Sequence, residues 1–121
     1  MKRPRILMIL CDPYLAGIYG RKFERDGWDV DIAEEVQDGE RRAAKSPPAI
    51  VMLEIDCVAD VVAEVKRLRS LPTLIRTKLV LLAKEADREL IEDAMAVGAD
   101  SFLLLGHFVP LEAVTKMRAL L

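Results

Sequence analysis

The chain has 121 residues, of which 52% are apolar and 31% charged, and its net charge is −2. This length favours one domain, 1–121, with a core large enough to fold without disulfide staples. The apolar content excludes a disordered chain. Because acidic and basic side chains nearly balance, we expect this domain to bind neither nucleic acid nor a membrane surface.

The lack of an apparent targeting signal and the small number of cysteines lead us to expect a cytoplasmic protein. No segment reaches the ~20 consecutive apolar residues of a membrane span, and the N-terminus lacks a signal-peptide pattern. The two cysteines, Cys11 and Cys57, are too few for a disulfide framework. We therefore expect two reduced thiols in a cytoplasmic location.

Five apolar segments alternate with five amphipathic ones along the chain. Continuous apolar runs predict buried strands, and apolar residues at helical spacing predict helices. The expected strands are Arg5–Leu10, Trp28–Ala33, Ala49–Glu54, Lys78–Ala83 and Ser101–Leu105. The expected helices are Pro13–Asp26, Glu35–Lys45, Val58–Arg69, Asp87–Val97 and Pro110–Leu121.

Local signals support these helices. Gly27 and Gly98 follow the first and fourth helices, where glycine commonly ends a helix. In the third helix the valines share one face, and these charged residues lie mostly away from it: Glu64, Lys66, Arg67 and Arg69. The last helix is expected to bury Leu111, Val114, Met117 and Leu121.

Strict alternation of strands and helices predicts an α/β fold with a doubly wound, five-stranded parallel sheet between two helical layers. In the flavodoxin-like strand order 2-1-3-4-5, the switch point lies between the first and third strands. Asp12 follows the first strand and Glu54 ends the third. The sequence therefore places two carboxylates at the edge of the sheet where ligands bind in such folds.

The whole chain resembles the receiver domain of bacterial response regulators, the CheY-like family. Four segments carry the resemblance: the first apolar strand with Asp12-Pro13, the run 48–53 before Glu54, the segment 96–100, and the closing 117–121. The resemblance implies a (βα)5 domain in a two-component or phosphorelay system. It also implies a histidine kinase or an output domain as the partner.

The resemblance further implies a five-part phosphoryl site. Two acidic residues hold Mg²⁺, an Asp accepts the phosphoryl group, and a hydroxyl and a Lys contact its oxygens. The corresponding positions here are Cys11 with Asp12, Glu54, Ala83, and Leu105 or Gly106 depending on the alignment. Only Asp12 is clearly retained. We therefore expect a pseudo-receiver that is not an enzyme, has no cofactor and acts through protein–protein interaction.

Several alternatives stay open for the two carboxylates. Glu54 could be phosphorylated, could imitate a phosphorylated state, or could be a relic carboxylate that is solvated or paired with Lys84; the last is preferred. An active, unconventional receiver would be phosphorylated on Glu54 or Asp56. Mg²⁺ could bind Asp12, Glu54 and the backbone near Asp56, whereas the plainer role for Asp12 is to cap the helix that begins at Pro13.

Other residues suggest further sites. Cys11 and Cys57 could form a redox pair, or a soft-metal site with His107, as an alternative to two separate thiols. A flavodoxin-like ligand or redox module is a weaker alternative, because no glycine follows the first strand before Gly17. The last strand with its flanking helices forms the expected partner surface, for a signalling protein or a second copy, through Lys84, Arg88, Phe102, Lys116 and Arg118.

Overall fold

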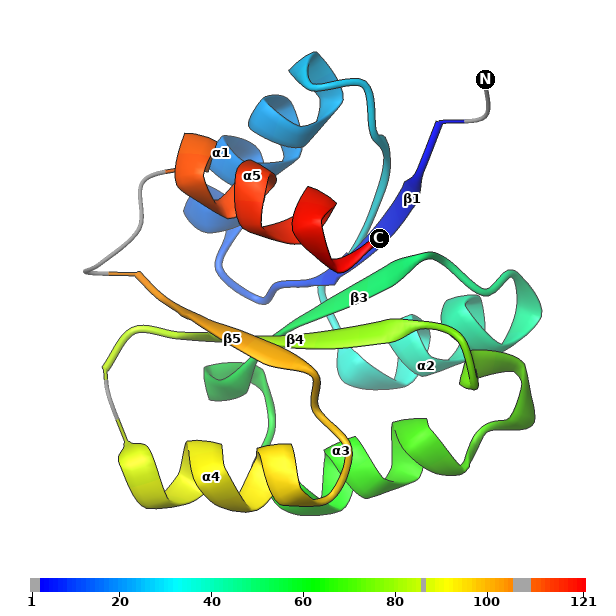
Figure 1. Ribbon diagram of the computed structural model, residues 1–121, viewed down its shortest axis with the longest axis vertical. Helices are drawn as coiled ribbons and strands as arrows, with labels where there is room; N and C mark the ends of the chain where they lie inside the picture. The colour runs from blue at the N-terminus through cyan, green and yellow to red at the C-terminus, as the bar shows by residue number, and fades with distance from the viewer. Residues whose placement is uncertain (1–2, 86, 106–109) are drawn as a thin grey trace.

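The computed structural model describes residues 3–85, 87–105 and 110–121 (Figure 1). Its five strands are all parallel and form one sheet in the order β2-β1-β3-β4-β5. The strands are β1 (Arg5–Ile9), β2 (Asp29–Ala33), β3 (Ile50–Glu54), β4 (Lys78–Ala83) and β5 (Ser101–Leu104). The helices are α1 (Pro13–Arg25), α2 (Val36–Lys45), α3 (Val61–Ser70), α4 (Arg88–Ala96) and α5 (Pro110–Leu120). The predicted fold class and strand order are confirmed.

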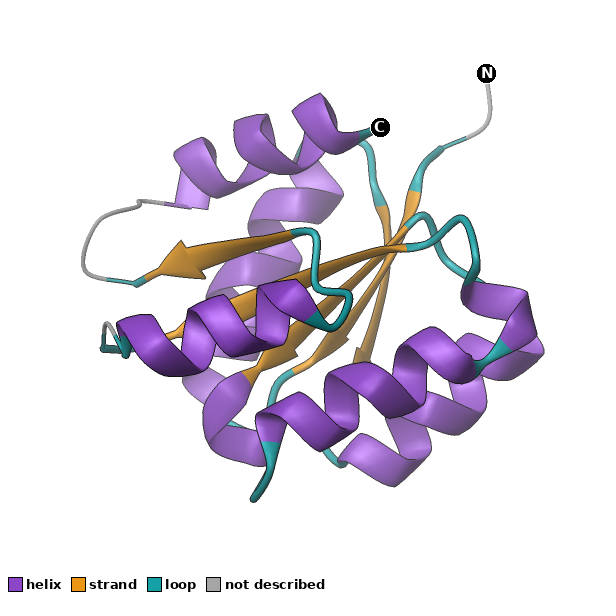
Figure 2. Ribbon diagram, turned by 60° about the horizontal axis from the view of Figure 1, so that its bottom comes forward, coloured by secondary structure: helices purple, strands orange, loops and turns teal. Residues whose placement is uncertain are grey.

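The sheet lies between two helical layers, as Figures 1 and 2 show. Helices α1 and α5 cover one face, and α2, α3 and α4 cover the other. Each face has its own cluster of buried apolar side chains. The central strands β1, β3 and β4 contribute alternate residues to both clusters, which explains why each is apolar except for one charged residue at its end.

Aspartates determine where three of the helices begin. The side chains of Asp12, Asp60 and Asp87 accept hydrogen bonds from backbone N–H groups in the first turns of α1, α3 and α4. The third helix therefore starts at Val61 and not at Val58 as predicted. The residues before it form a short 3-10 helix, Ile55–Cys57, and Asp60 provides the cap.

The last helix buries a different stripe from the one predicted. Val114 and Met117 are buried, but Leu111 and Leu121 are 58% and 60% exposed. Because Ala113 is also buried, the buried stripe is rotated away from Leu111, and Leu121 follows the last residue of α5.

Arg69 joins several segments at the amino ends of the strands. Its guanidinium donates hydrogen bonds to the carbonyl oxygens of Gly98, Leu74 and Thr77 at 2.9, 3.0 and 2.7 Å. It also donates to Asp100 Oδ2 at 2.6 Å, and this oxygen accepts the Leu79 N–H at 2.8 Å. Gly98 has a φ of +134°, and a Cβ there would overlap the Arg69 side chain. Arg69 thus connects several segments, although the sequence pattern placed it only mostly away from the apolar face of its helix.

We expect Arg69→Ala to lower the free energy of unfolding by about 2–4 kcal/mol, because three carbonyl groups and a carboxylate lose a charged donor. Arg88→Ala is the matched control. The Arg88 side chain is 91% exposed and pairs across one helical turn with Glu92, so its loss should cost less than about 0.5 kcal/mol. Urea unfolding of both variants measures the difference, and equal midpoints would contradict the role given to Arg69.

Candidate functional site

The carboxyl ends of β1, β3 and β4 bring the predicted site residues to one edge of the sheet. Glu54 ends β3 and is only 1% exposed. Within the described ranges, the structure gives its carboxylate one hydrogen bond, from the Asp12 N–H to Oε1 at 3.4 Å. The interpretation of Glu54 as a solvated or Lys84-paired carboxylate is therefore wrong.

Lys84, a possible partner of Glu54 in the sequence analysis, pairs with Asp12. Oδ1 of Asp12 accepts the Tyr14 N–H at 2.9 Å and so caps α1, as predicted. Its Oδ2 lies 3.6 Å from Lys84 Nζ in a partly exposed ion pair. Lys84 is exposed at the end of β4, where Asp12 is easier to reach than the buried Glu54.

The two cysteines form a disulfide bond between the segment after β1 and the 3-10 helix after β3. The two Cα atoms are 5.7 Å apart, near the middle of the range that disulfides span. The backbone N–H of Cys11 also donates to Cys57 Sγ at 3.0 Å. The expectation of two reduced thiols is therefore wrong, because β1 and β3 are neighbours and carry both cysteines to the same place.

Three groups that could hold a metal lie together at this edge of the sheet. Cys11, Glu54 and Cys57 each offer a ligand atom, and these atoms all lie within 4.8 Å of one another. Asp56 is exposed and lies with Lys84 along a shallow groove of about 410 Å³. His107, the third residue of the predicted soft-metal site, and Gly106, the alternative lysine position, fall outside the described residues.

The hydroxyl and lysine positions carry apolar side chains. Ala83 is fully buried at the end of β4. Leu105 is half-buried, packs against the core under α1 and α5, and donates its N–H to the Ala83 carbonyl at 2.9 Å. These two positions thus hold the strand ends together and offer no side-chain donor to an anion at Glu54.

The residues of the expected partner surface are partly engaged within the domain. Arg88 is highly exposed, and Phe102 is half-buried beneath Lys116. Lys116 Nζ donates to the Phe102 carbonyl at 2.9 Å and lies 5.3 Å from the centre of its ring. Arg118 donates to Asp26 Oδ2 at 2.6 Å and stacks near Trp28, so its charge ties α5 to the turn before β2.

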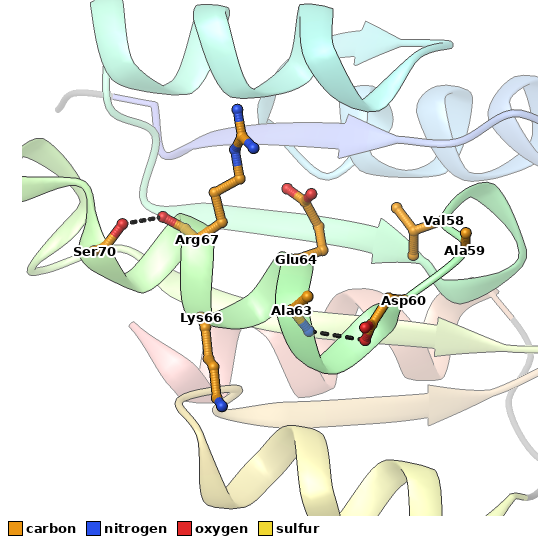
Figure 3. A pocket seen from close by; sticks show the side chains of 8 residues that line it. All are labelled: Val58, Ala59, Asp60, Ala63, Glu64, Lys66, Arg67 and Ser70. Carbon is orange, nitrogen blue, oxygen red and sulfur yellow. Dashed lines mark hydrogen bonds between the residues drawn. The ribbon is translucent and has the colours of Figure 1, made fainter.

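A carboxylate pair between α2 and α3 was not predicted. Glu64 and Arg67 extend from α3 toward α2, whereas Lys66 points away (Figure 3). They line a groove of about 620 Å³, and Arg67 Nε holds the Glu40 carboxylate at 3.1 Å. Glu64 Oε2 is buried and has no hydrogen-bond partner among the residues that the structure describes. Burial, with the neighbouring Glu40, raises the pKa of Glu64 to about 8, against an opposing effect of Arg67.

Comparison with known proteins identifies the fold. Chemotaxis protein CheY4 of Vibrio cholerae superposes with a TM-score of 0.89 and 17% identity, over 99% of this chain and 100% of its own. An orphan response regulator of H. pylori gives a TM-score of 0.87 and 19% identity, over 98% of each chain. A signal receiver domain from Bermanella marisrubri gives 0.86 and 24%, over 98% of each chain. The chain has the receiver-domain fold.

Of the comparisons, the one with solved structures finds the receiver fold. No protein-family model matches the sequence, and a search of curated proteins finds no significant match. In the three ranges that the structure covers, no helix combines the length and apolarity needed to cross a bilayer. Identities of 17–24% show the shared fold, and the site residues must be judged on their own geometry.

The disulfide should stabilise the receiver fold measurably. It closes a loop of 46 residues in the unfolded chain, so its reduction should lower the free energy of unfolding by about 2–4 kcal/mol. We expect this loss in denaturant titrations with and without a phosphine reductant, in the presence of a chelator. The Cys11→Ser/Cys57→Ser variant should match the reduced protein to within about 0.5 kcal/mol. Equal stability of the oxidised and reduced proteins would contradict this expectation.

Glu64 should make stability fall as pH rises. Its pKa in the folded protein, about 8, lies above the ordinary value of 4.5, so the folded state binds a proton more tightly than the unfolded state does. This contribution is complete below pH 4.5 and is lost as pH rises to about 8. Glu64→Gln should flatten the melting-temperature profile between these pH values, whereas Glu89→Gln on the exposed face of α4 should not. An unchanged profile in Glu64→Gln would show that another group dominates.

Proposed function

We propose that this chain is a phosphorylation-independent receiver module of a two-component or phosphorelay system, working through protein–protein contacts. The observation that carries the proposal is the burial of Glu54. At 1% exposure, the carboxylate in the acceptor position is closed to a phosphodonor that would have to approach its oxygen in line. The receiver fold supports the signalling context.

The surroundings of Glu54 support the same conclusion through charge. A transferred phosphoryl group needs cations and donors aimed at its oxygens. Lys84 is paired with Asp12, Ala83 has no hydroxyl, and Leu105 has no charge. Phosphorylation would therefore add negative charge to a buried position that already holds a carboxylate, and autophosphorylation is not expected.

The signal is then set by the fixed conformation or by a partner. We propose that the partner, a histidine kinase or an output domain in the cytoplasm, docks on α4, β5 and α5. Exposed charges of both signs on α4, such as Arg88 with Glu92, suit paired contacts across such a surface. A second copy of the chain is the alternative partner. Sedimentation of wild type and Arg88→Glu would reveal a charge-dependent dimer.

The phosphorylation state is tested by incubation with Mg²⁺ and a small acyl phosphate, followed by intact-mass measurement. The oxidised and reduced forms are assayed separately. If neither form gains an adduct, the disulfide cannot be the reason for the negative result. We expect no phosphoryl adduct in either form, and no spectral change with beryllofluoride. A receiver domain with the complete five-part site serves as the positive control.

An adduct that maps to Glu54, Asp56 or Asp12 would contradict the proposal and favour an active, unconventional receiver. Glu54→Gln and Asp56→Asn separate the first two cases, because only the variant lacking the acceptor should lose the adduct. A chromophore that copurifies with the chain would favour a flavodoxin-like ligand module instead.

A further inference from the structure

The strongest unassigned feature is the cluster of Cys11, Cys57 and Glu54. Two sulfur atoms and a carboxylate oxygen lie within 4.8 Å of one another at the carboxyl edge of the sheet. Cys11 is exposed, Cys57 is half-buried, and Glu54 is 1% exposed. The cluster is thus open on the side of Cys11 and closed on the side of the sheet.

Glu54 is a buried carboxylate with a single weak hydrogen bond among the described residues. An ionised carboxylate that is removed from water needs a cation, several donors or a proton. Over the described parts of the chain, Glu54 has a single 3.4 Å hydrogen bond, and the nearby cation Lys84 is paired with Asp12. A positive ion beside the two sulfurs would provide a partner for this carboxylate.

We propose that Cys11, Cys57 and Glu54 form a redox-gated site for a soft divalent cation of the zinc class. In the reduced protein, two thiolates and one carboxylate bind the ion, and water takes the fourth position. In the oxidised protein, the disulfide replaces the ion. This site goes beyond the proposed function, and its test does not depend on whether the chain is phosphorylated.

The ligand chemistry selects the ion. Thiolates favour zinc-like ions, whereas Mg²⁺ requires an octahedral shell of oxygen atoms. Two thiolates on a tetrahedral zinc, each at ~2.3 Å, lie ~3.8 Å apart. Once the disulfide is reduced, its sulfurs must separate to about this distance, and the Cα separation of 5.7 Å lets side-chain rotation achieve it. The Cys11 N–H that donates to Cys57 Sγ favours a negative charge on that sulfur.

Oxidation by a low-molecular-weight disulfide closes the site in two exchanges. The exposed Cys11 thiolate attacks one sulfur of the oxidant, forms a mixed disulfide and releases one thiolate. The Cys57 thiolate then attacks Cys11 Sγ, forms the protein disulfide and releases the second thiolate. Both released thiolates take up protons. Overall, the metal-bound dithiolate, one oxidant molecule and two protons yield the protein disulfide, two small thiols and the free metal ion.

Metal titration of the whole chain tests the site. The protein is reduced with a phosphine, freed of metal, and titrated with Co²⁺ as a spectroscopic probe and with Zn²⁺ against a chromophoric chelator. We expect one ion per chain, a sulfur-to-cobalt charge-transfer band, and loss of that band in Cys11→Ser and in Cys57→Ser. Glu54→Gln should weaken Zn²⁺ binding at least about tenfold, the lower end of what loss of even an outer-shell partner costs.

Matched controls keep the test independent of folding. Asp56→Asn removes an exposed carboxylate from the same 3-10 helix and should leave the affinity unchanged. Circular dichroism identifies any variant that fails to fold. In that case the Zn²⁺ affinities of wild type and Asp56→Asn are still compared. Oxidised glutathione should release one Zn²⁺ for each protein disulfide formed.

Three results would overturn the proposal. The first is that the reduced wild type binds Zn²⁺ no more tightly than the double serine variant. The second is that Asp56→Asn weakens binding as much as Glu54→Gln. The third is that Zn²⁺ stays bound after the disulfide has formed, which would remove the redox gate.

Discussion

Parallel pairing of the central strands is the constraint on which the rest of this structure depends. Because all five strands run in one direction, every strand delivers its last residues to the same edge of the sheet. The register of β1 on β3 pairs Ile9 with Leu53, so the residues that follow each strand must lie side by side. Neighbouring strands are about 4.8 Å apart, and this spacing places Cys11 and Cys57 within reach of a covalent bond.

Glu54 is buried and Glu64 is partly buried, and their surroundings differ. Between α2 and α3, Glu64 faces Glu40 and avoids a second negative charge by keeping a proton, as its raised pKa shows. At the sheet edge, Glu54 faces two sulfur atoms and a single weak donor. The first arrangement is a pair of neighbouring carboxylates beside a groove at the α2–α3 contact, and the second is a set of ligand atoms that includes the exposed Cys11.

The sequence was informative wherever one residue or one periodic pattern sufficed to determine the structure. The apolar runs gave the strands, and Asp12 before Pro13 predicted the cap of α1, because both signals are local. The disulfide, the burial of Glu54 and its separation from Lys84 depend on how three loops meet, and no spacing along the chain encodes that. Glu64 was placed only away from the apolar face of its helix, because its surroundings are determined by the neighbouring helix α2.

The residues that replace the phosphoryl site have a common effect on charge and on the type of ligand atoms at the sheet edge. A phosphoryl site balances a negative group with Mg²⁺ and a lysine, and an apolar residue at the lysine position removes half of that balance. A carboxylate left alone in such a place would cost the fold several kcal/mol, which a proton or a different cation must offset. Cys11 stands where an acidic ligand would be, and Cys57 is brought beside it by the 3-10 helix after β3. The pair changes the edge of the sheet from a hard oxygen site into one with sulfur ligands, in which oxidation of two thiols can alter the local charge as phosphorylation does in a complete receiver.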